Sequence, residues 1–258
     1  MSDGWSPDQY HRFAAERRQP FDDLVRLIRP VPGGRVLDLG CGTGELTVEL
    51  HRHLQASATV GLDSSEKMLS SARTIGEDNV TFHAADIGDF ADVDEWDVIA
   101  ANASLHWVAD HPALVPRLVA GLRPGGQFAA QVPANVDHPS HTTSAELAAG
   151  EFAATFPDGP PPDPVQGVLA PEAYAQLLDD LGAVDQHVRL QVYAHHLPST
   201  AAVVEWVRGT SLTRFERVMT PEDFSRFLDR YREELLGRLG DHRPYFYAFK
   251  RILMWARF

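Results

Sequence analysis

The sequence predicts an α/β protein with a doubly wound, mostly parallel sheet of seven strands and a helical cap formed by insertions. In the first half of the 258 residues, short aliphatic runs alternate with stretches of helical periodicity. Such alternation is typical of a parallel sheet with crossover helices. In the second half, segments rich in Pro and Gly interrupt this alternation before it resumes. Because this length suffices for one large domain, we expect a single domain over residues 1–258.

Five strands and three intervening helices are expected in the first half of the chain. Aliphatic runs bounded by turns predict strands at residues 35–39, 59–62, 80–84, 98–101 and 127–132. Apolar residues at helical spacing predict helices at residues 45–54, 65–73 and 112–122. The first helix carries Leu46, Leu50 and Leu54 on one face. A Ser-Ser pair at 64–65 supplies an N-cap for the second, and Pro-Gly-Gly at 124–126 ends the third.

Two insertions, residues 134–170 and 198–244, are expected in the second half. In the first insertion, PDGPPPDP at 157–164 predicts a loop and residues 143–156 are a candidate helix. The other predicted elements are helices at 171–181, 199–209 and 221–239 and strands at 184–192 and 247–256. Because open α/β folds bind ligands at the carboxyl ends of their strands, we expect both insertions to pack there around one cleft.

Composition and charge narrow the function classes. The net charge is −13, from 23 basic and 36 acidic residues, and such a field disfavours nucleic acid and anionic lipid as partners. No uninterrupted apolar run is long enough to span a membrane, and the N-terminus has no leader pattern, so we expect a cytoplasmic protein. The single cysteine, Cys41, excludes an internal disulfide. Residues 1–150 sum to −10, whereas residues 189–258 sum to +4, so the two ends are expected to do different jobs.

A glycine-rich loop follows the first predicted strand, in VLDLGCGTGELT at 36–47. Its glycines, Gly40, Gly42 and Gly44, let the backbone turn tightly and approach a ligand closely. A dinucleotide fingerprint would need its third glycine at the position of Glu45, so NAD and FAD are disfavoured. No Gly-Lys-Ser or Gly-Lys-Thr follows, so the loop is not a nucleotide-triphosphate P-loop.

Acidic residues occur at the ends of three successive strands. Asp38, beside the glycine loop, suits a ligand that carries an ammonium group. Asp63 can accept both hydroxyls of a ribose. Asp86 can accept from an adenine amino group while Ile87 packs on the ring. Each could be a turn or cap residue alone, but together they predict a site for an adenosyl amino acid.

This constellation resembles the class I S-adenosylmethionine-dependent methyltransferases, whose pattern also includes the LRPGG sequence at 122–126. The resemblance covers the first half of the chain and implies S-adenosyl-L-methionine as cofactor, with S-adenosyl-L-homocysteine as product. The cofactor contacts that it implies are Asp38, Gly40, Gly42, Gly44, Asp63, Ser64, Met68, Asp86, Ile87 and Asn102.

A narrower resemblance extends over nearly the whole chain. It is carried by WSPDQYHRFAAERRQP, GLDSSEKML, ANASLHWVADH, QVPANVDHPSH, HHLPST followed by VVEWV, and FKRILMWAR. These segments are similar to those of trans-aconitate 2-methyltransferases, which methylate one carboxylate of a small tricarboxylic acid. The resemblance implies a small anionic polycarboxylate as substrate. We also expect a monomer or weak homodimer, and N-terminal helices within residues 1–30 that cover the cofactor.

The chemistry of such an acceptor calls for positive clamps. A carboxylate is ionised at neutral pH and needs no general base, so alignment with the methyl group is the main requirement. Arg forks, His and amide donors would hold the remaining carboxylates. The candidate substrate contacts are Arg17, Tyr10, Trp107, His141, His195, Trp206, Lys250 and Arg251. For Arg17, a contact with the carboxylate of the cofactor is an open alternative, and for Arg251 the alternative is an edge-strand charge.

His106 is the candidate catalytic residue, with two possible roles. It follows the fourth strand and would be a positioning donor for a carboxylate acceptor. If the acceptor is instead a hydroxyl, phenol or amine, His106 would be the general base. A cofactor-binding sensor without turnover is a third hypothesis. The pairs at His138/His141 and His195/His196 have no third ligand at suitable spacing, so we expect no metal.

Overall fold

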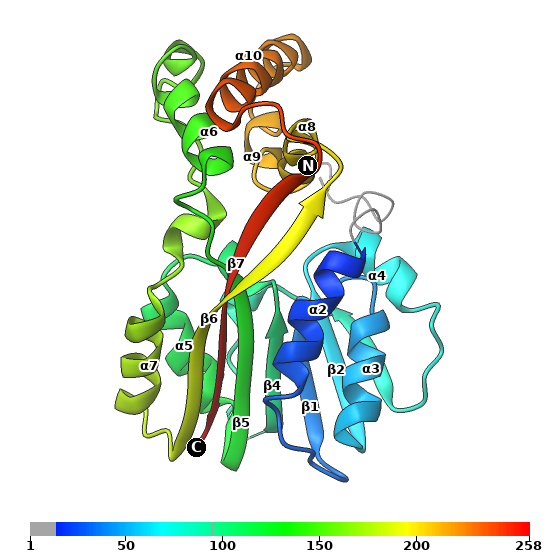
Figure 1. Ribbon diagram of the computed structural model, residues 1–258. Helices are drawn as coiled ribbons and strands as arrows, with labels where there is room; N and C mark the ends of the chain where they lie inside the picture. The colour runs from blue at the N-terminus through cyan, green and yellow to red at the C-terminus, as the bar shows by residue number, and fades with distance from the viewer. Residues whose placement is uncertain (1–13, 94) are drawn as a thin grey trace.

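The computed structural model describes residues 14–93 and 95–258. A seven-stranded sheet in the order β3-β2-β1-β4-β5-β7-β6 runs through the molecule. Strands β1 to β5 are mutually parallel, and β7 pairs antiparallel with both β5 and β6. The predicted fold class, a doubly wound and mostly parallel sheet with seven strands, is therefore confirmed (Figure 1).

The strands are β1 (Arg35–Leu39), β2 (Ala58–Asp63), β3 (Val80–Ala84), β4 (Trp96–Asn102), β5 (Leu122–Pro133), β6 (Asp185–Leu197) and β7 (Tyr245–Arg257). The α-helices are α2 (Ala14–Val25), α3 (Glu45–Leu54), α4 (Glu66–Ala72), α5 (His111–Ala120), α6 (Pro139–Ala149), α7 (Pro171–Asp180), α8 (Ala201–Arg208), α9 (Thr213–Glu216) and α10 (Pro221–Leu239). Four short 3-10 turns are η1 (Ile87–Asp89), η2 (Leu105–Trp107), η3 (Ala153–Thr155) and η4 (Pro164–Gly167).

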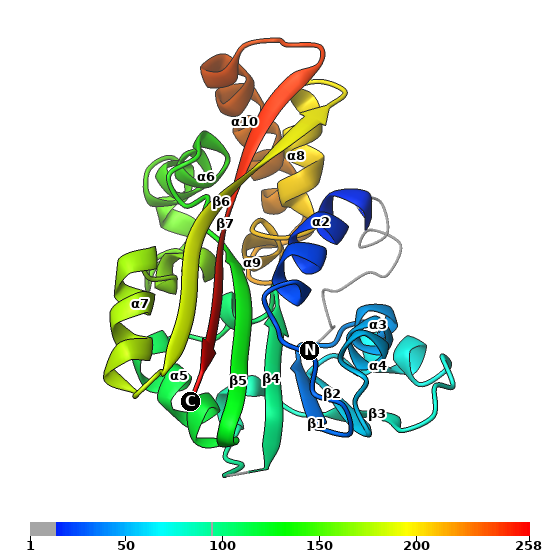
Figure 2. The same ribbon diagram turned by 60° about the horizontal axis from the view of Figure 1, so that its bottom comes forward.

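Helices cover both faces of the sheet. On one face, α2 and α3 bury Leu24, Leu50 and Leu54 in a core that continues into the cap. On the other, α5 and α7 bury a second core that includes Leu118 and Leu178 (Figures 1 and 2). Because both faces are covered, the central strands are almost continuously apolar, as expected for a doubly wound sheet.

Strands β6 and β7 extend beyond the rest of the sheet and carry the cap (Figure 1). In this extension only one face is covered, and buried residues alternate with exposed ones along β7. Tyr245, Tyr247 and Phe249 therefore face the cap, and Arg251 follows with the same alternation. This register brings the side chain of Arg251 to the junction between the cap and the sheet.

The cap consists of α6, α8, α9 and α10 packed around aromatic side chains (Figure 2). The Phe215 and Phe227 rings lie 4.6 Å apart, and Phe152 meets Phe227 edge-on at 5.2 Å. Tyr231 on α10 donates a 2.8 Å hydrogen bond to the backbone carbonyl of Ser140 on α6. Aromatic pairs of this geometry add to the stabilisation that comes from their buried area. The two predicted insertions thus share one core.

Several predicted boundaries need correction. The bounds of the helix predicted at 143–156 are wrong. Helix α6 begins at Pro139, because the His138 side chain caps it, and it ends at Ala149 before Gly150. Strand β6 continues past the predicted end at residue 192 to Leu197, because the cap buries one face of the extension. The second predicted helix is capped by Ser65, whose side chain accepts from the Met68 amide. Helix α9 was not predicted.

In the described part of the chain, none of the helices combines the length and the apolar character needed to cross a bilayer.

Candidate active site

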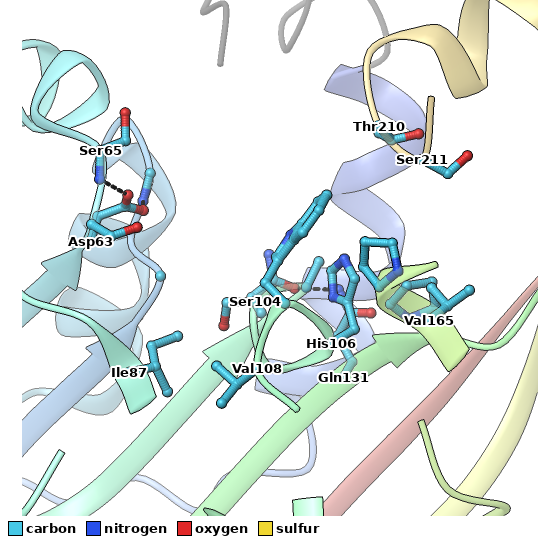
Figure 3. A pocket seen from close by; sticks show the side chains of 18 of the residues that line it. Asp63, Ser65, Ile87, Ser104, His106, Val108, Gln131, Val165, Thr210 and Ser211 are labelled. Atoms are coloured by element: carbon cyan, nitrogen blue, oxygen red, sulfur yellow. Dashed lines mark hydrogen bonds between the residues drawn. The ribbon is translucent and has the colours of Figure 1, made fainter. Parts of the chain in front are cut away.

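A cavity of about 410 Å³ lies between the carboxyl ends of the parallel strands and the cap. Residues from the glycine loop and the ends of β2 and β4 line one side of it. Residues from η2, η4, α6, β7 and the turn between α8 and α9 line the other. Figure 3 shows Asp63 and Ile87 at one end, His106, Gln131 and Val165 at the other, and Thr210 and Ser211 on the cap side.

The glycine loop turns tightly at the carboxyl end of β1. At Gly40 the backbone has φ +77°, and a Cβ there would lie 2.2 Å from the Cβ of Ser104. Ser104 in turn donates a 2.5 Å hydrogen bond to the backbone carbonyl of Leu39. Gly42 also has a positive φ, and its amide faces the cavity side, where it donates to Asp63 at 2.9 Å. Only glycine fits the close approach at Gly40 without displacing its neighbour.

Asp63 and Asp86 lie at the cavity wall, as the ribose and adenine contacts were expected to do. The two oxygens of Asp63 each accept a backbone amide, from Gly42 at 2.9 Å and from Ser65 at 2.8 Å, which fixes the carboxylate plane. Asp86 accepts from the Gly88 amide at 2.7 Å, and Ile87 lines the cavity beside it. The cavity walls also include Ser64, Met68 and Asn102.

Asp38 lies beneath the loop, in a small hollow of about 30 Å³ that it shares with Gly40 and Asn102. Burial raises the pKa of its carboxyl to about 6, although a 2.6 Å hydrogen bond from Thr47 opposes the shift. No described cationic side chain is paired with Asp38. An ammonium group in this hollow would compensate for the buried charge, so the residues present fit the amino-acid end of S-adenosylmethionine.

The other end of the cavity is organised by Arg251. Its side chain is 7% exposed, and its guanidinium lies 4.7 Å above the centre of the Phe249 ring. It donates to Gln131 at 3.1 Å, and Gln131 donates to Asn102 at 2.7 Å. This hydrogen-bonded row crosses β7, β5 and β4 and connects the two ends of the cavity. The edge-strand alternative for Arg251 does not hold, because β7 lies between β5 and β6.

His106 lies in η2 at the cavity wall and is 9% exposed. Its ring lies 5.0 Å from that of Trp107, which also lines the cavity. Burial, with a further contribution from the charge of Arg251, lowers the pKa of His106 to about 3. The turn itself is held by His111, which bonds to the backbone carbonyl of Leu105 at 2.9 Å. His106 is therefore neutral at physiological pH and is a weak base.

His141 lies on α6 at the cavity wall and contacts Asp163. The distance between His141 Nδ1 and Asp163 Oδ2 is 2.9 Å, and Arg214 on α9 forms an ion pair with the same carboxylate. Trp206 and Phe249 complete this side of the wall. This end of the cavity thus gathers side chains from α6, η4, α8, α9 and β7.

Some predicted site residues lie elsewhere. Lys250 points away from the cavity lining and pairs with both oxygens of Asp137 at 2.6 Å. His195 is buried against Trp206 and Phe249, with ring centres 5.4 and 5.9 Å apart, but does not line the cavity. Gly44 does not line the cavity, and a Cβ there would lie 2.8 Å from Phe82 and 2.9 Å from Ala72. Tyr10 and the side chain of Arg17 lie outside what the structure describes.

Several lining residues were not predicted, among them the polar or charged Gln131, Asp163, Ser211 and Arg217. Ser211 is 5% exposed, and its hydroxyl has no hydrogen-bond partner among the described residues. Arg217 is an exposed cation on the cap side of the cavity. Asp163 lies in the Pro-rich segment that predicts only a loop, and one available signal was its position directly before Pro164, which is typical of a helix N-cap.

The described residues hold no group of three or more His, Cys, Asp or Glu side chains suited to a metal ion.

Known proteins that resemble this chain identify the class of protein to which the site belongs. A family model described as a methyltransferase domain matches residues 30–162, about half of the chain. The YcgJ protein of Bacillus subtilis shares the fold with a TM-score of 0.59 at 15% identity, covering 93% of this chain and 98% of that one. Phosphoethanolamine N-methyltransferase 2 of Haemonchus contortus, solved with S-adenosyl-L-methionine, aligns with a TM-score of 0.54 at 16% identity over 93% and 52% of the two chains. The fold and the site define an S-adenosylmethionine-dependent methyltransferase.

Full-length relatives narrow the assignment. The trans-aconitate 2-methyltransferase of Deinococcus radiodurans is 42% identical over 98% of this chain and 97% of its own. The enzyme of the same name from Escherichia coli is 35% identical over 100% and 99%, and that from Mycobacterium tuberculosis is 35% identical over 98% and 96%. The chain belongs to the trans-aconitate 2-methyltransferase family.

Proposed function

We propose that the protein transfers the methyl group of S-adenosylmethionine to a carboxylate oxygen of a small polycarboxylic acid, trans-aconitate. The relatives that align over their full length carry this activity in their names. The observation that carries the proposal is Arg251, a buried guanidinium in the wall of the cavity opposite Asp63 and Asp86. A cytoplasmic location and a monomer or weak homodimer remain predictions from the sequence.

The two ends of the cavity have different roles in this proposal. When bound, S-adenosylmethionine supplies a methyl group on a sulfonium, which is displaced in line and leaves a neutral thioether. The acidic end, with Asp38, Asp63 and Asp86, would hold the cofactor, and the residues around Arg251 would hold the acceptor. An acceptor carboxylate is already ionised at neutral pH, so no residue has to remove a proton.

Alignment is therefore the main task of the acceptor end. Arg251 presents a planar fork of donors that matches a carboxylate, and Gln131 fixes one edge of that fork. The Trp206 and Phe249 rings, with Trp107, exclude water around it. In such a dry environment a charged hydrogen bond is stronger than in water, and the acceptor is held in one orientation.

The alternative reaction, with His106 as base for a hydroxyl, phenol or amine, has less support. Burial and the nearby charge of Arg251 lower the pKa of His106 to about 3, and a base this weak removes a proton from such an acceptor poorly. We assign His106 a positioning role, through hydrogen bonds of its neutral ring.

The test is a panel of acceptors. S-adenosylhomocysteine formation is measured with trans-aconitate, cis-aconitate, citrate, a phenol and no acceptor. Selective turnover with trans-aconitate is expected. Preferred turnover of the phenol would favour the alternative reaction, and tight cofactor binding without turnover of any acceptor would favour a sensor.

A further inference from the structure

The carboxylate of Asp163, in the cavity wall, joins η4 to helices α6 and α9 of the cap. Asp163 is the N-cap of η4 and lies at the end of the Pro-rich segment. Its partners are His141 on α6 and Arg214 on α9. All three side chains are about nine-tenths buried, with exposed fractions of 10% for Asp163, 9% for His141 and 7% for Arg214.

The two oxygens of Asp163 have separate partners. Oδ1 accepts from the backbone amide of Val165 at 3.1 Å, and Val165 is itself in the cavity wall. Oδ2 accepts from His141 and pairs with Arg214. Arg214 also donates to the Ser144 hydroxyl at 3.3 Å, one turn after His141 on α6. The carboxylate and its two partners are thus fixed in orientation.

The geometry also fixes which nitrogen of His141 is available. Burial by itself raises the pKa of the Asp163 carboxyl, but the hydrogen bond and charge of His141 and the charge of Arg214 outweigh it and lower this pKa to about 2. An ionised carboxylate is an acceptor only, so Nδ1 of His141 carries the proton that it shares. Nε2, on the opposite side of the ring, is left for a ligand of the cavity.

A purely structural role does not account for this arrangement well. Buried ion pairs give little net stability, because desolvation offsets most of the attraction between the charges. Apolar side chains of similar volume would join α6, η4 and α9 at least as well. The arrangement also lies in the cavity wall: His141, Asp163, Pro164 and Val165 all line it.

We propose that Asp163 is a positioning residue for the acceptor: it orients His141 so that Nε2 binds a carboxylate of the substrate other than the one that is methylated. In the imidazolium form both ring nitrogens donate, and the ring then lies between two carboxylates, that of Asp163 and that of the substrate. Arg214 holds Asp163 in place from the cap side. This inference rests on the proposed function, because it requires a polycarboxylate acceptor.

A double-mutant cycle tests it, with Asp163→Asn, His141→Gln and the double variant in the full-length protein. The KM for trans-aconitate, the kcat and the Kd for S-adenosylhomocysteine are measured for each. We expect each single variant to raise the KM by about tenfold, because each removes or misorients the contact that His141 makes with the acid. In the His141→Gln background, Asp163→Asn should then raise the KM no further. The Kd for S-adenosylhomocysteine should stay unchanged throughout.

The matched control is Asp137→Asn, which makes the same chemical change in the same insertion. Asp137 pairs with Lys250 and does not line the cavity, so its variant should keep the wild-type KM. If Asp163→Asn raises the KM equally in both backgrounds, or leaves it unchanged in the wild-type background, the inference is overturned. Should Asp163→Asn fail to fold, Asp163→Glu, which keeps the charge but displaces it, replaces it in the same cycle. Absence of turnover by the wild-type protein with any polycarboxylate would instead refute the proposed function.

Discussion

The two ends of the cavity carry opposite charge and are assembled differently. The proposed cofactor end uses Asp63 and Asp86, each within a few residues of a strand end. Asp63 accepts from the Gly42 amide of the glycine loop and from the Ser65 amide of its own loop, and Asp86 accepts from the Gly88 amide of its own loop. The proposed acceptor end uses Arg251, His141 and Asp163, which come from β7, α6 and η4. The first end depends on local turns, whereas the second depends on how the cap packs on the sheet.

Because the two ends are assembled differently, substitutions at each end should affect different measured quantities. A change at the cofactor end should alter cofactor binding and leave the acceptor contacts in place, because backbone amides of nearby loops orient the acids. A change at the acceptor end should alter the KM for the acid and leave cofactor binding intact. The row from Arg251 through Gln131 to Asn102 is a hydrogen-bonded connection between the two ends.

Removing the buried guanidinium should have the largest effect. We expect Arg251→Gln to lower kcat/KM for trans-aconitate by about 10²- to 10³-fold, because truncating one partner of a buried charged contact costs about 2–5 kcal/mol. The Kd for S-adenosylhomocysteine should change little. Steady-state kinetics and equilibrium binding measure the two quantities.

Lys250→Gln is the matched control for that variant. It removes a positive charge from the adjacent position on β7, but Lys250 pairs with Asp137 outside the cavity. A similar loss of kcat/KM in both variants would mean that general electrostatic attraction, rather than a contact from Arg251, holds the substrate.

The next largest effect is expected at Asp38. Because burial raises the pKa of this carboxyl to about 6, above its value in the unfolded chain, ionised Asp38 destabilises the cofactor-free protein at higher pH. An ammonium ligand favours the ionised form, so affinity for S-adenosylmethionine should fall by up to about tenfold per pH unit as the pH drops below 6. Calorimetric titration across this range measures the slope.

Asp38→Asn should weaken cofactor binding at neutral pH, remove this pH dependence and leave the cofactor-free protein at least as stable. Unchanged affinity in this variant would contradict the assignment of the small hollow to the ammonium group.

A smaller effect is expected from Arg217 on the exposed side of the cavity. Arg217→Gln should raise the KM for trans-aconitate a few-fold, with the difference shrinking at high salt, because an exposed charge is screened. Arg208→Gln is the control, since Arg208 is an exposed cation of the same cap that does not line the cavity. Equal effects of both variants would argue against a specific role for Arg217.

The smallest effect is expected at His106. The proposed reaction needs no base, so His106→Gln should change kcat by no more than about threefold, a cost of roughly 0.7 kcal/mol. The pH profile of kcat between about pH 6 and 9 should keep its shape. Loss of turnover together with loss of the acidic limb of the profile, where activity falls as an essential base is protonated, would restore His106 as general base.

Most of the fold followed from the sequence because its signals are local. Aliphatic runs separated by amphipathic segments predicted all seven strands, and Gly40, Gly42 and Asp63, which are predicted cofactor contacts, line one cavity. The boundaries of β6 and α6 could not be predicted from the sequence. Where β6 ends depends on which face the cap buries, and where α6 begins depends on the His138 side chain.

The acceptor end was only partly predictable for the same reason. Arg251 was identified, but the adjacent Lys250 could not be told apart from it until the register of β7 showed which one faces the cap. Asp163 and Arg214 meet although they lie in different insertions, and no spacing in the sequence indicates such a contact. Long-range packing decides these contacts.

The central claim is that the acceptor is a carboxylate, and the product tests it most directly. The protein is incubated with trans-aconitate and S-adenosylmethionine labelled in its methyl group, and the labelled product is treated with mild alkali. A methyl ester would release its label as methanol, and we predict this result. Failure to transfer label to trans-aconitate, or label in a product that mild alkali does not hydrolyse, would contradict the account.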